Sequence, residues 1–82
     1  SILLYRARAL AKRGLPDAAI DVLTHALRRR KDRPEPLLHQ IRYDRADLYE
    51  RVGRRAQSRR EFERLYAEAP GFEGLPERLG LE

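Results

Sequence analysis

The stretch ADLYERVG, residues 46–53, determines the fold that the chain is expected to adopt. A small residue, Ala46, stands seven positions before the terminal glycine, and a bulky one, Tyr49, stands four before it. After the glycine come a small residue, Ser58, and then a bulky one, Phe62. Small residues let two helices approach closely, and glycine permits a tight turn because a left-handed backbone costs it little. The pattern predicts an antiparallel helical hairpin that turns at the glycine.

The same pattern occurs 39 residues earlier in the chain. The identical pairs are Ile2 with Ile41, Arg6 with Arg45, Ala7 with Ala46, and Gly14 with Gly53. Residue classes match at Leu10 with Tyr49, Ala19 with Ser58, and Leu23 with Phe62. A single hairpin cannot bury its own apolar face, so such units stack on one another. We therefore expect an all-α fold of two stacked antiparallel helical hairpins.

Glycine and proline mark the boundaries of these units. Breaks are predicted at residues 14–16, 33–36, 53 and 70–71, and the segments between them are rich in good helix formers. No segment alternates as a strand would. We expect one domain over residues 1–82, with hairpin one at 1–31, hairpin two at 37–69 and a short C-terminal capping helix within 72–80. The cap is expected to pack on Phe62, Leu65 and Tyr66.

Composition narrows the class of protein. The 82 residues include no cysteine, so no disulfide and no thiolate metal site is expected. Apolar runs are too short to span a bilayer, and the first residues do not have the pattern of a signal peptide. These features favour a soluble, cytoplasmic protein with no membrane partner. Because the chain lacks an initiating Met and its tail resembles a cap, we interpret it as the C-terminal part of a longer array.

Residues 1–70 resemble the tetratricopeptide repeat (TPR). The match is clearest from Ala46 through Gly53 to Pro70, and the segment around Gly14 provides a second match. The chain departs from the family in its spacing, which is 39 residues rather than 34. It also departs in composition: Arg6 and Arg45 stand where the family favours Leu, Arg42 replaces a large apolar residue, and Leu65 replaces a small one.

The resemblance implies a non-catalytic scaffold that binds a peptide or protein along a groove lined by the first helix of each hairpin. The groove residues that it implies are Leu4, Arg8, Lys12, Tyr43, Asp47, Glu50 and Arg51. Arg8 and Lys12, one turn apart, would together hold a carboxylate. The Lys and Asn positions of the TPR clamp for chaperone C-termini do not hold these residues here, so that clamp is not expected. In the alternative interpretation these side chains only decorate a helix, through i to i+4 pairs such as Asp47–Arg51 and Glu50–Arg54.

The sequence also bears on nucleic-acid binding, catalysis and self-association. All but Lys12 and Lys31 of the 18 basic residues are arginine, and the net charge of +5 raises nucleic acid as a partner. The arginine clusters lack interleaved aromatic residues and a recognised motif, so nucleic acid is the less favoured alternative.

His25 and His39 stand apart and without a nucleophile, so no catalytic residue, metal site or cofactor is expected. Two hairpins are few for a solenoid, and the N-terminal edge predicts either a homodimer or burial by preceding sequence.

Overall fold

A computed structural model describes residues 1–81 of the chain, and over these residues the protein is all-α, as predicted. The helices are α1 (Ile2–Lys12), α2 (Pro16–Arg28), α3 (Glu35–Arg51), α4 (Arg55–Glu68) and the short α5 (Leu75–Arg78). None of the helices in this part of the chain combines the length and the apolar character needed to cross a membrane.

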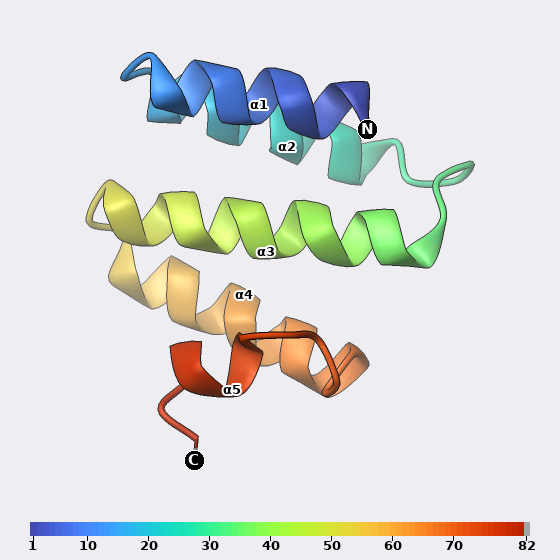
Figure 1. Ribbon diagram of the computed structural model, residues 1–82, viewed down its shortest axis with the longest axis vertical. Coiled ribbons are helices and arrows are strands. Elements are labelled where there is room, and N and C mark those ends of the chain that lie inside the picture. Colours follow the sequence, from blue (N-terminus) through green and yellow to red (C-terminus); the bar gives the residue numbers. More distant parts are fainter. Residues whose placement is uncertain (82) are drawn as a thin grey trace.

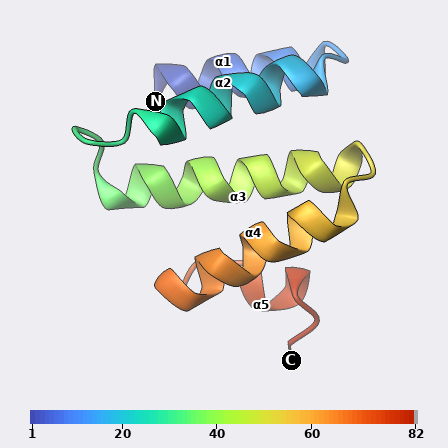
Figure 2. The same cartoon turned by 180° about the vertical axis from the view of Figure 1, so that it is seen from behind.

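The helices form two layers (Figures 1 and 2). Helices α1 and α2 run antiparallel as one hairpin, and α3 and α4 as a second hairpin stacked on the first through α2 and α3. Helices α1, α3 and α5 lie on one face, while α2 and α4 lie on the other. The predicted arrangement of two stacked hairpins and a C-terminal capping helix is confirmed, with α5 standing where the first helix of a third hairpin would begin.

Both hairpins turn in the same way. Gly14 and Gly53 adopt φ of +83° and +86°, the left-handed region that a side chain would strain. After each glycine, the backbone N–H reaches back five residues to close the preceding helix: Leu15 donates to Leu10 at 2.9 Å and Arg54 to Tyr49 at 2.8 Å. These donors and acceptors are themselves 39 residues apart, so the repeat seen in the sequence is also a repeat of backbone geometry.

The start of the third helix differs from the expected boundary. Helix α3 begins at Glu35, whereas the second hairpin was expected to begin at residue 37. The two prolines around Glu35 do not exclude it from the helix, because Pro34 is the N-cap and Pro36 lies in the first turn. A proline there gives up only an N–H that has no partner within the helix.

The small residues of the repeat lie where the helices meet. Ala7, Ala19, Ala46 and Ser58 are all buried, which confirms their structural role. One apolar cluster joins α1, α2 and α3 around the fully buried Leu23 and Ile41. A second cluster joins α3, α4 and the cap; its buried members are Ala46, Phe62, Leu65, Leu75 and Leu79. Leu65, where the TPR pattern has a small residue, fills the space between α4 and the cap.

Arg45, one of the departures from the TPR pattern, forms an ion pair. Arg45, where the family favours Leu, donates to both carboxylate oxygens of Glu61 at 2.8 and 2.9 Å and to the hydroxyl of Thr24 at 3.2 Å. The side chains of Arg45 and Glu61 are only 15% and 8% exposed. Arg45 therefore joins α2, α3 and α4 through polar contacts.

The C-terminal segment covers the second hairpin as predicted. Phe72 stacks on Tyr43 with ring centroids 5.1 Å apart, and Tyr43 meets Phe62 edge-on at 5.4 Å. Among residues 1–81, no segment covers the opposite edge in this way. Ile2 is 81% exposed, whereas Ile41, its repeat counterpart, is completely buried; Tyr5 is 75% exposed.

A mixed-charge groove between the first helices of the two hairpins

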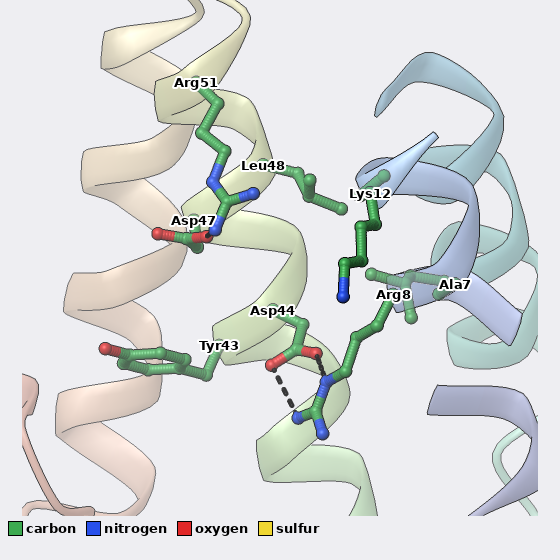
Figure 3. A pocket seen from close by; sticks show the side chains of 10 residues that line it. Ala7, Arg8, Lys12, Tyr43, Asp44, Asp47, Leu48 and Arg51 are labelled. Atoms are coloured by element: carbon green, nitrogen blue, oxygen red, sulfur yellow. Dashed lines mark hydrogen bonds and ion pairs between the residues drawn. The ribbon is translucent and has the colours of Figure 1, made fainter. Parts of the chain in front are cut away.

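A groove of about 380 Å³ lies between α1 and α3. Its floor is apolar, and its walls carry charged side chains from both helices (Figure 3). Ala7 and Ala11 face it from α1, and their short side chains leave open the space that longer ones would fill. The full lining is Ala7, Arg8, Ala11, Lys12, Leu23, Tyr43, Asp44, Asp47, Leu48 and Arg51.

A bidentate ion pair crosses one end of the groove. Arg8 of α1 donates from Nε to Asp44 Oδ2 at 2.6 Å and from Nη2 to Oδ1 at 3.2 Å. Gln40, one turn earlier on α3, donates to the same carboxylate at 2.9 Å. The hydrogen bond to Asp44 raises the pKa of Arg8 above its ordinary value, although partial burial acts in the opposite direction. Arg8 therefore holds the two hairpins together as well as lining the groove.

A second cluster of charges connects the groove to the cap. Asp47 accepts from Arg51 at 3.0 Å and from Arg78 of α5 at 2.9 Å. Arg78 also donates to Glu50 at 2.6 Å and to the hydroxyl of Tyr43 at 3.2 Å. Burial alone would lower the pKa of Arg78, but the hydrogen bonds to Glu50, Tyr43 and Asp47 raise it well above the ordinary value.

Lys12 differs from the other cations of the groove. In Figure 3 its side chain extends from α1 into the space between the helices, on the far side of Leu48 from Arg51. Within residues 1–81, no hydrogen bond or ion pair involves its ammonium group. The groove thus contains one cation that forms no ion pair with a carboxylate of the described chain.

Five of the seven residues implied by the TPR resemblance line the groove. They are Arg8, Lys12, Tyr43, Asp47 and Arg51. Leu4 does not: it is buried in the core with α2 and α3. Glu50 points to the cap instead and lines a neighbouring hollow with Arg78.

The alternative interpretation named two i to i+4 ion pairs on this helix, and the structure contains one of them. The Asp47–Arg51 pair is confirmed. The predicted Glu50–Arg54 pair is wrong, because α3 ends at Arg51 and Arg54 lies in the turn beyond it, while Glu50 pairs with Arg78. The i to i+4 spacing applies only where the helix continues through both residues.

Sequence reasoning missed two residues that shape this site, Asp44 and Arg78. Asp44 reaches Arg8 across 36 residues, and Arg78 reaches Glu50 across 28. No local spacing rule signals such partners. The position of Asp44 was a usable signal. It lies on α3 one turn before Leu48, so both residues share the face of α3 that lies toward α1.

The arginine clusters do not form one surface at the helix ends. Residues 28–31 lie where α2 leads into α3, and residues 54–55 lie at the turn between α3 and α4, at the opposite end of the helices (Figure 1). Arg59 of α4 is engaged by Glu63 at 3.0 Å. Of the histidines, His25 is exposed and His39 lies 3.5 Å from Glu35. Among the described residues, no group of three or more His, Cys, Asp or Glu is placed to hold a metal ion.

The groove therefore offers an apolar floor, two carboxylates that are already paired, and three cations, of which Lys12 is unengaged within the described chain. Comparison with known proteins adds no relative: no protein-family model, curated protein or solved structure matches the chain.

Proposed function

We propose that this chain is a non-catalytic, TPR-like scaffold that binds a peptide or a segment of a protein in the groove between α1 and α3. The observation that carries the proposal is the groove itself, about 380 Å³ in volume and built from the first helices of both hairpins. An apolar floor with a few placed polar groups is the usual composition of a binding site.

The contacts around the groove also support a binding role. The groove helices are held in place by the Arg8–Asp44 pair on one side and by Arg78 on the other. A groove fixed in this way loses little conformational freedom when a ligand enters, so more of the contact energy appears as affinity.

The proposal is tested by filling the groove. Peptides that bind the chain are selected from a random displayed library and then tested against Ala11→Leu, which places a larger side chain inside the groove. Ala67→Leu is the matched control, because Ala67 is exposed on α4, away from the groove. Thermal unfolding of both variants checks that each remains folded.

We expect the selected peptides to lose binding to Ala11→Leu and to keep it with Ala67→Leu. Equal binding to the two variants, or a selection that yields no binder, would contradict a peptide-binding groove at this position.

A further inference from the structure

The unused hydrogen-bonding capacity of the groove is almost entirely donor capacity. Asp44 already accepts three hydrogen bonds, two from Arg8 and one from Gln40. Asp47 is shared between Arg51 and Arg78. A cationic ligand would have to displace these donors to reach either carboxylate. The ammonium group of Lys12, by contrast, offers three N–H donors to a ligand that can accept them.

The charges lead to the same conclusion. Three cations line the groove, Arg8, Lys12 and Arg51, against the two carboxylates of Asp44 and Asp47. Arg8 is matched by Asp44, and Arg51 by Asp47, which leaves the charge of Lys12 in excess. A ligand that complements this groove supplies a single negative charge at Lys12.

We infer that the groove recognises an acidic peptide segment, with an Asp or Glu carboxylate bound by Lys12 and an apolar neighbour over the floor beside Leu48. This inference rests on the proposed function and adds the chemistry of the partner. It also changes the site that spacing suggested: Arg8 and Lys12 were expected to hold a carboxylate together, but Arg8 is already engaged by Asp44.

The same charges argue for a peptide rather than a nucleic acid. A polyphosphate lying along the groove would bring successive negative charges against Asp44 and Asp47, which repel them. A single carboxylate needs to contact only Lys12, the groove cation that has no ion pair among residues 1–81. The clusters at residues 28–31 and 54–55, which would attract a polyphosphate, lie at opposite ends of the helices and outside the groove.

The test uses three short fluorescent peptides that share the same apolar residues and carry Glu, Gln or Lys at the polar positions. Binding is measured by fluorescence anisotropy at low and moderate salt, for the unmodified chain, Lys12→Gln and Lys31→Gln. Lys31 is the only other lysine of the sequence and is exposed before α3, so Lys31→Gln makes the same chemical change outside the groove. Labelled duplex and single-stranded DNA serve as competing probes.

We expect the Glu peptide to bind most tightly and its affinity to fall with salt. Lys12→Gln should weaken it by up to about fivefold, the upper limit for an exposed ion pair, and Lys31→Gln should leave it unchanged. Arg51→Gln provides a second variant, for which a smaller loss is expected because Arg51 is shared with Asp47.

Other outcomes separate this inference from the proposed function. If the Gln or Lys peptide binds as tightly as the Glu peptide and amide chemical shifts change at α1 and α3, the groove binds peptides but not acidic ones, and only the inference falls. If Lys12→Gln and Lys31→Gln weaken binding of the Glu peptide equally, the inference also falls. It falls too if DNA binds more tightly than the Glu peptide and this DNA binding depends on Lys12. If no peptide binds, both fall.

Discussion

Replacing Arg78 by Met should loosen the C-terminal cap from the second hairpin. Arg78 is the only charged residue of α5 that reaches α3, where it contacts Asp47, Glu50 and Tyr43. Its guanidinium also lies 4.7 Å from the centre of the Phe62 ring. Methionine keeps an apolar stem of similar reach and removes only the charge and the donors, so the variant isolates the polar contacts.

The size of the effect follows from these contacts. The side chain of Arg78 is 27% exposed, so each of its two ion pairs is expected to contribute only about 0.5 kcal/mol. The contact with Phe62 adds about 0.5–1 kcal/mol, and the hydrogen bond to Tyr43 a similar amount. The free energy of unfolding should therefore fall by about 2 kcal/mol, which lowers the melting temperature of a domain this small by about 10 °C.

Thermal and urea unfolding, followed by circular dichroism, measure this change. The matched control is Arg60→Met, because Arg60 is exposed on α4 and forms no ion pair within residues 1–81. A double-mutant cycle with Glu50→Gln gives the energy of that pair alone. An unfolding free energy for Arg78→Met within 0.5 kcal/mol of that for Arg60→Met would refute the claim that these contacts hold the cap, because the error of such reasoning is a few tenths of a kcal/mol.

Three further changes test the rest of the fold. Ala46→Leu should overpack the second hairpin, where Ala46 is completely buried, and cost about 1–3 kcal/mol of stability, measured by thermal unfolding. Glu61→Gln should cost about 1–3 kcal/mol, measured by urea unfolding, because the mostly buried Arg45 then lacks its carboxylate partner. Replacing exposed Ile2 and Tyr5 by Ser should leave stability within about 0.5 kcal/mol and convert any dimer formed through α1 to monomer in sedimentation velocity.

Each of these changes has a control or a contradicting result. Ala67→Leu adds the same side chain at an exposed site of α4, and a similar loss there would remove the argument from packing. Glu63→Gln breaks the exposed pair with Arg59 and should cost less than about 0.5 kcal/mol. An unmodified chain that sediments as a monomer at every concentration would contradict dimerisation through α1.

The hairpins and their turns were predictable because they depend on local chemistry. Gly14 and Gly53 mark the turns, and the small residues seven before and five after each glycine identify the contact between the paired helices. The capping role of the tail followed from apolar residues at helical spacing. The helix start at Glu35 was missed because a proline was read as a break, although the first helical turn accepts it.

The outline of the groove was predictable, but the ion pairs within it were not. Its walls follow from the repeat, since equivalent positions of two stacked hairpins face the same side. The choice of carboxylate for each cation depends on distances between helices. Spacing along the sequence does not give these distances. Arg8 and Asp44 are the clearest example. They are 36 residues apart, so no helical spacing relates one to the other.

Arg45 has a consequence for how the chain folds. Most contacts join neighbouring helices, a topology with low contact order that favours rapid folding. Such arrays unfold piece by piece when the interfaces between units are weak. Arg45 belongs to the second hairpin, where it pairs with Glu61, and it also bonds to Thr24 of the first hairpin. Opening of the first hairpin therefore exposes a charged pair that is otherwise mostly buried. The two hairpins should therefore exchange their slowest amide protons in a single cooperative opening.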